Sequence, residues 1–151
     1  MLALELDKND VKSFMGRLLR EEIFDAFEAR TAEISAFVRI TLDGVKEAPE
    51  DGAAKGGFSL WSEVRPLVFE IIKASSKPRH MKMIFSHNAA EEIHTNAAAL
   101  FLNVLYENDS LTFTTATAQK EFALDKSLDT AWDTWVRSFF EKIGVNVKDR
   151  E

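Results

Sequence analysis

The feature that most constrains the fold is a run of apolar residues at helical spacing near the C-terminus. Its members recur every three or four positions: Leu128, Ala131, Trp132, Trp135, Val136, Phe139, Phe140 and Ile143. This spacing places them on one face of an α-helix, which Asp125 or Ser127 can cap and Gly144 can end. Because each buried apolar side chain contributes ~1.5–3 kcal/mol, we expect this helix to anchor a hydrophobic core.

Much of the remaining chain alternates apolar and polar residues, which is the pattern of half-buried strands. It predicts strands at 2–7, 31–43, 81–86, 100–106, 111–116 and 122–124. A further, shorter strand across 23–28 would precede the strand at 31–43. The turn Glu107-Asn108-Asp109-Ser110 joins two of them into a hairpin. We therefore predict an α+β fold, a single compact domain over 1–151 with a largely antiparallel sheet and packed helices.

Two further long helices are predicted. The first covers about 9–19, where apolar residues again share one face. The second follows Leu60, but Pro66 lacks an N–H and clashes inside a helix, so its regular part is expected to begin near Pro66. Inside the first half of the chain, residues 45–58 are mostly small or charged and predict a flexible loop. The order of elements resembles two strand–helix–strands halves, as in processivity-clamp-like folds.

Composition narrows the classes of function. The net charge of −6 argues against broad nucleic-acid binding. We interpret a local basic cluster (Lys73, Lys77, Arg79, His80 and Lys82) as a solvated loop and strand start. The chain has no cysteine, which excludes disulfides and cysteine-based metal sites. No signal peptide and no membrane-spanning segment are found, so the expected location is cytoplasmic, with no membrane partner.

The segment Ser86-His87-Asn88-Ala89-Ala90-Glu91-Glu92-Ile93-His94 is the richest in chemistry. If it were all helical, His87, Glu91 and His94 would share one face as ligands of a metal ion. The favoured interpretation is a capping box, in which Asn88 caps the helix and Glu91 bonds back to it.

Three carboxylates also recur at i, i+4 and i+8: Asp125, Asp129 and Asp133. They could bind a cation. Their place near a helix N-terminus, where negative charge is stabilising, favours a structural role.

No catalytic motif is found: there is no nucleophile elbow and no glycine-rich phosphate loop. The favoured hypothesis is a non-enzymatic protein-interaction module, with a protein partner or a homo-oligomer and no cofactor. The alternatives are a metal-dependent or small-molecule-handling enzyme and a nucleic-acid-associated, clamp-like factor.

Four segments of the chain form a recognisable set of motifs: Phe24-Asp25-Ala26-Phe27, Leu42-Asp43-Gly44, Trp61 with Arg65-Pro66, and Leu124 to Asp133. Together they resemble an uncharacterised family of small bacterial proteins, a domain of unknown function. The resemblance covers most of the chain and is sharpest at 124–133. It implies a bacterial cytoplasmic protein and identifies no site residue.

Overall fold

A computed structural model describes residues 1–47, 57–75 and 77–150. In chain order the elements are β1 (Ala3–Leu6), a 3-10 turn (Lys8–Asp10), α1 (Val11–Arg20), β2 (Glu28–Ser35), β3 (Arg39–Asp43), α2 (Trp61–Ala74), β4 (His80–Ser86), α3 (Ala90–Ile93), β5 (Ala97–Glu107), β6 (Ser110–Gln119), α4 (Ser127–Lys142) and β7 (Val147–Asp149).

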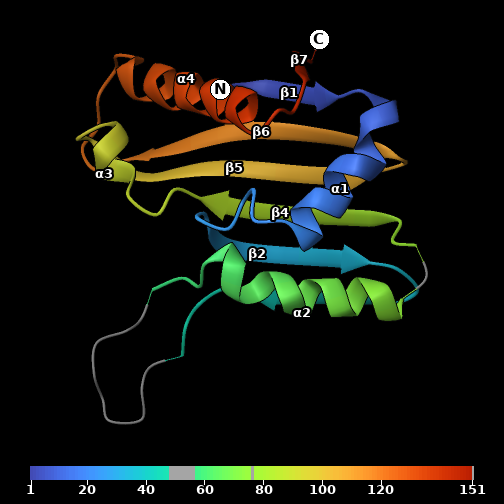
Figure 1. The fold of residues 1–151 in the computed structure, drawn as a ribbon. Helices are drawn as coiled ribbons and strands as arrows, with labels where there is room; N and C mark the ends of the chain where they lie inside the picture. The colour runs from blue at the N-terminus through green and yellow to red at the C-terminus, as the bar shows by residue number, and fades with distance from the viewer. Residues whose placement is uncertain (48–56, 76, 151) are drawn as a thin grey trace.

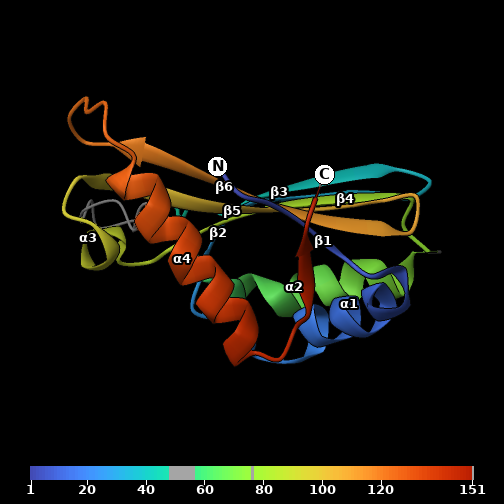
Figure 2. The ribbon, with the colours of Figure 1, turned by 90° about the horizontal axis from the view of Figure 1, so that it is seen from above.

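The strands form one seven-stranded antiparallel sheet in the order β3-β2-β4-β5-β6-β1-β7. In Figure 1, α1 and α2 lie in front of this sheet and α4 lies along its upper edge. Seen from above, the three long helices lie on the same side of the strands (Figure 2). The predicted α+β fold with a largely antiparallel sheet is confirmed.

The core lies between this helical layer and the inner face of the sheet. Phe24, at the centre, is fully buried and its ring lies 5.1–6.5 Å from five other phenylalanine rings. From α4, Leu128, Trp132, Val136 and Phe140 are buried. At the end of the helix, Gly144 has a positive φ of 74°, and the Val145 N–H donates to the Phe140 carbonyl at 2.9 Å. The C-terminal helix predicted from the aromatic pattern is confirmed.

The prediction of one long strand over 31–43 is wrong, because this segment belongs to a hairpin of β2 and β3. The chain reverses at Ala36, whose N–H donates to the Val38 carbonyl at 3.0 Å, and Phe37 at the tip is 77% exposed. No Gly, Pro, Asn or Asp marks the turn, so the alternating pattern runs through it. The shorter strand at 23–28 is also wrong over most of its length, because 21–27 forms turns and β2 begins at Glu28.

Helix α2 begins at Trp61, so the prediction of a start near Pro66 is wrong. Two contacts hold the turn before the proline. The Glu63 carboxylate accepts from the Leu60 N–H at 3.1 Å, and the buried Trp61 indole donates to the Leu18 carbonyl at 3.1 Å. These contacts offset the hydrogen bond that Pro66 cannot make.

At the C-terminal side, 122–124 is a loop rather than a strand, and β7 was not predicted. Three residues are too short for a periodic signal.

The two halves predicted from the order of elements do not pair equivalently. β1, from the first half, lies beside β6, whereas β4, its counterpart in the second half, lies between β2 and β5. The sheet order therefore gives no support to the clamp-like arrangement. Most of the predicted flexible loop 45–58 lies outside the described residues. Its described ends pair, and the Lys46 N–H donates to the Gly57 carbonyl at 2.8 Å.

Candidate functional site

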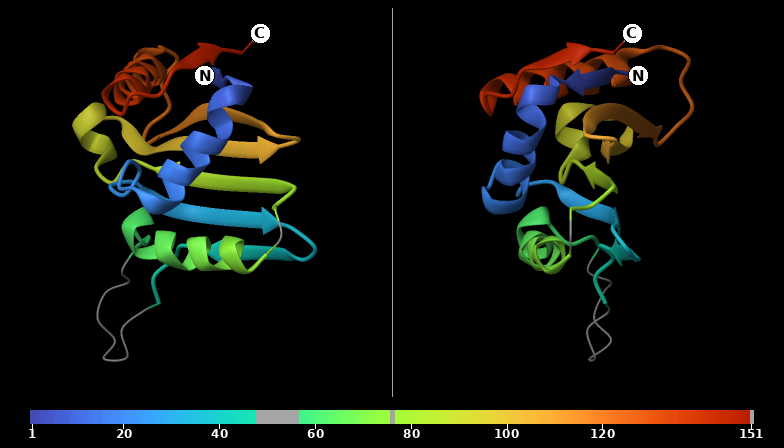
Figure 3. Two further views of the ribbon diagram at one scale, coloured as in Figure 1. Left: turned by 45° about the vertical axis from the view of Figure 1, so that its right-hand side comes forward. Right: turned by 90° about the vertical axis from the view of Figure 1, so that its right-hand side faces the viewer.

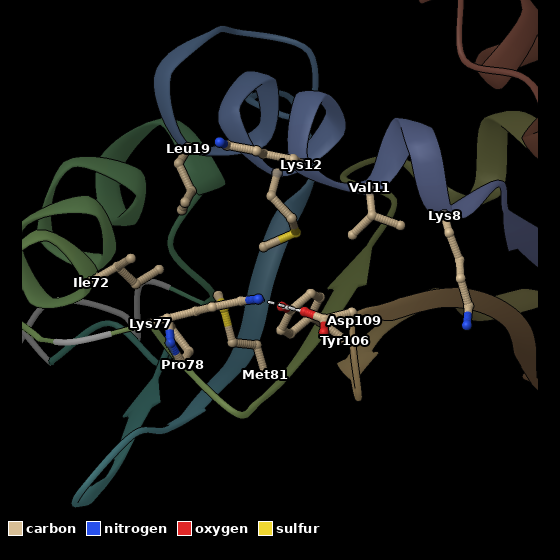
Figure 4. Close-up of a pocket in the computed structure, with 11 residues that line it drawn as sticks. Lys8, Val11, Lys12, Leu19, Ile72, Lys77, Pro78, Met81, Tyr106 and Asp109 are labelled. Atoms are coloured by element: carbon tan, nitrogen blue, oxygen red, sulfur yellow. Dashed lines mark hydrogen bonds and ion pairs between the residues drawn. The ribbon is translucent and has the colours of Figure 1, made fainter.

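A groove opens between α1, α2 and one end of the sheet, with a volume of about 520 Å³. Figure 4 shows the side chains that line it: Lys8, Val11, Lys12, Met15, Leu19, Ile72, Lys77, Pro78, Met81, Tyr106 and Asp109. Its volume falls in the range of ~300–1,000 Å³ that is typical of binding pockets. We call this site the α1–α2 groove.

The floor of the groove is apolar. Met81 from β4 is 2% exposed and Val11 from α1 is 5% exposed. Met15 and Leu19 continue the same face of α1, one turn apart, and Ile72 closes the groove from α2. The sequence pattern explains why these side chains face the groove. Successive turns of α1 carry apolar residues on one face, and the alternation of β4 points its methionines inward.

The rim of the groove carries three ammonium groups, from Lys8, Lys12 and Lys77, and one carboxylate, from Asp109. The Lys77 Nζ lies 2.6 Å from Asp109 Oδ1, and the Tyr106 hydroxyl donates to the same oxygen at 3.0 Å. Both Asn108 and Asp109 have a positive φ, 51° and 61°, so the β5–β6 turn aims this carboxylate at the groove (Figure 4).

These contacts fix the charges of the rim. The hydrogen bond from Lys77, with that from Tyr106 next, holds the pKa of Asp109 below its usual value. The same bond to Asp109 raises the pKa of Lys77, and burial, followed by the bond to Asp109, raises the pKa of Tyr106. At neutral pH, Asp109 is therefore ionised, Lys77 is charged and Tyr106 is protonated, so these shifts move all three groups away from proton exchange near neutral pH.

The three residues considered as metal ligands each have other partners. The His87 Nδ1 accepts from the Ala89 N–H at 2.9 Å. Glu91 forms an ion pair with Lys120. The His94 Nδ1 accepts from the Asn96 N–H at 3.1 Å. Because α3 spans only Ala90–Ile93, both histidines lie outside it and the shared helical face does not exist.

Within the described parts of the chain, no group of three or more His, Asp or Glu side chains is placed to hold a metal ion. The metal site stays a prediction without geometric support. The capping box is wrong: the residue before α3 is Ala89, and no side chain caps the helix.

The three aspartates just before and within α4 have structural partners. Thr115 Oγ1 donates to Asp133 at 2.6 Å, Thr117 Oγ1 donates to Asp129, and Asp125 accepts from the Ser127 N–H at 3.0 Å. The threonines of β6 thus join the sheet to α4, which supports the structural interpretation of these carboxylates.

Sequence reasoning missed the groove. The sequence predicts a solvated loop around Lys77 and a turn at Asp109. Lys8 and Lys12 are separated from them by more than 60 positions, so no spacing rule links the four. The available signal was weak: two lysines at i and i+4 beside the apolar face of a helix.

The fold and the groove define a small antiparallel α+β protein with an apolar, lysine-rimmed cavity at one end. A family model, described as a family of unknown function (DUF5721), matches residues 17–148. The chain belongs to this family, which agrees with the resemblance seen in the sequence; a bacterial origin stays an expectation. No curated protein matches the chain, and no solved structure matches it. In the described residues, no helix is long and apolar enough to cross a membrane.

Proposed function

We propose that this protein is a non-enzymatic interaction module whose α1–α2 groove binds an apolar, acidic segment of a protein partner. The observation that carries the proposal is the combination of an apolar floor with a rim of three lysines and one aspartate. In a chain of net charge −6, such a concentration of ammonium groups around apolar surface is selective for the opposite charge. We place this activity in the cytoplasm as part of the proposal.

Binding suits the groove better than catalysis does. Lys77, Asp109 and Tyr106 hold one another in their ordinary charge states, whereas a catalytic acid or base needs a pKa near the working pH. The enzyme and nucleic-acid hypotheses stay untested predictions, and the lysine rim gives no continuous basic track for a phosphate backbone.

The test is fluorescence anisotropy with a labelled peptide that carries Phe and Leu two positions apart between Glu and Asp. A control peptide has Lys in place of both acids. We expect the acidic peptide to bind at least tenfold more tightly, and its affinity to fall as salt is raised. In the protein, Lys12→Glu should weaken the binding several-fold. Lys142→Glu, an exposed charge reversal in the last turn of α4 and outside the groove lining, is the matched control. Equal binding of both peptides would refute the proposal.

A further inference from the structure

The loop between β6 and α4 presents two large apolar side chains to solvent. Phe122 and Leu124 are 86% and 83% exposed. The backbone of this loop is nevertheless fastened at two points. The Gln119 amide donates to the Ala123 carbonyl and accepts from its N–H, both at 3.1 Å. The exposure therefore belongs to an ordered loop.

The second point of attachment is Asn96. Its amide donates to the Glu121 carbonyl at 2.9 Å and accepts from the Glu121 N–H at 3.0 Å. A loop that is ordered before binding loses less conformational freedom when it binds. The arrangement is thus suited to recognition by a partner rather than to packing within this chain.

The chemistry of this loop complements that of the α1–α2 groove. Glu121 and Asp125 flank Phe122 and Leu124, so two apolar side chains stand between two carboxylates. The groove offers an apolar floor and a lysine rim. We propose that the partner is a second copy of this chain, and that residues 121–125 of one copy bind in the α1–α2 groove of the next. This inference deepens the proposed function and rests on it.

The loop cannot reach the groove of its own chain. The groove includes Asp109 in the β5–β6 turn, and the loop follows the other end of β6 (Ser110–Gln119). Ten residues of strand at ~3.3 Å each span roughly 30 Å. Figure 1 shows the β5–β6 turn and the β6–α4 connection at opposite ends of the sheet, and Figure 3 shows α1 crossing the strands from β1 towards α2.

A contact between two different surfaces is heterologous, so copies add head to tail and form a ring or an open chain. Two apolar side chains offset only part of the cost of association, so we expect Kd values in the range of ~10 µM to 1 mM.

The first experiment is sedimentation velocity of the full chain at increasing concentration. Phe122→Ser with Leu124→Ser removes the loop anchors, and Lys8→Glu with Lys12→Glu reverses the groove rim. Circular dichroism checks that each variant folds. We expect the average mass of the wild type to rise with concentration and both double variants to stay monomeric. The control is Phe37→Ser at the tip of the β2–β3 hairpin. It also removes a large aromatic side chain, one that is 77% exposed, and this variant should associate like the wild type.

The second experiment mixes the two double variants. The loop variant keeps its groove and the groove variant keeps its loop, so the mixture should give one-to-one dimers and nothing larger. A mixture that stays monomeric, or single variants that associate like the wild type, would overturn the inference. If the wild type is monomeric up to about 1 mM but binds the acidic peptide, the second-copy inference fails and the proposed function stands. If it binds neither, both fail.

Discussion

Asp25 and Arg65 form an ion pair with two parallel hydrogen bonds, at 2.8 and 2.9 Å. Each side chain is only 18% exposed. The pair fastens the turns before β2 to α2, next to Phe24 and Phe27 in the core. It therefore holds the non-repetitive segment that connects α1 to the sheet.

We expect Arg65→Met to lower the free energy of unfolding by about 2–3 kcal/mol, because it leaves the Asp25 carboxylate mostly out of water without a partner. Urea denaturation measures the loss. The control is Arg137→Met, which breaks the ion pair between Arg137 and Asp149. These two side chains are 48% and 67% exposed. That change should cost less than about 1 kcal/mol. Equal losses would show that burial does not set the strength of the Asp25–Arg65 pair.

Gly44 lies so close to β2 that a Cβ atom on it would be 1.6 Å from the Ala29 carbonyl oxygen. We expect Gly44→Ala to destabilise the protein by at least ~1–3 kcal/mol, because the backbone of β2 must move.

The control for that change is Gly16→Ala in α1. There the added Cβ meets only the end of the Arg20 side chain, at 2.8 Å, and alanine favours a helix by up to ~1 kcal/mol. This variant should be neutral or more stable, as thermal denaturation of both proteins can show. If Gly44→Ala were as stable as the wild type, the close contact between Gly44 and the Ala29 carbonyl would be contradicted.

His87 makes stability depend on pH. Its ring lies 4.9 Å from the Trp135 ring, and burial lowers the pKa of His87 below 6.5, although Glu92 and Glu28 partly offset this. The unfolded chain therefore binds the proton more readily than the folded chain does. The stability that the neutral His87 ring contributes is fully present above the pKa of His87 in the unfolded chain. It is lost as the pH falls from 6.5 through the lower pKa of His87 in the folded chain.

NMR titration of the His87 ring should give a midpoint below 6.5, the ordinary value. Urea denaturation between about pH 7.5 and pH 5 should show a loss of stability for the wild type that is smaller in His87→Phe. An identical pH dependence in the two proteins would show that His87 does not contribute.

Trp61 connects α2 to α1 through its indole N–H, which donates to the Leu18 carbonyl at 3.1 Å in the buried core. Leu18 lies in the last turn of α1, where carbonyls lack helical partners. We expect Trp61→Phe to cost about 1–3 kcal/mol beyond the loss of ring volume. Trp135→Phe, in a half-buried position of the same aromatic cluster, is the control for ring size. Similar losses in both variants would show that the hydrogen bond adds little.

Periodicity predicted the elements that carry many repeats. Helix α4 has four buried residues at helical spacing, and the β5–β6 hairpin pairs across the turn that its sequence marked. The predictions failed where a few residues decide the outcome, as at the Ala36–Val38 turn and at α3. At the Ala36–Val38 turn no Gly, Pro, Asn or Asp marks the reversal. At α3 the sequence offers Asn88 as a cap, but the helix begins after Ala89, so local signals alone do not decide either conformation.

The sequence by itself determined the class of fold, the C-terminal helix and its aromatic face, and the family, because repeating patterns and motifs are local properties of the chain. Only the tertiary structure decided the strand order, the β2–β3 hairpin and the α1–α2 groove. Lys12 and Asp109 line the same groove because β1, β5 and β6 share a sheet. Pairing between distant strands depends on which faces can be buried together, and spacing along the chain does not record it.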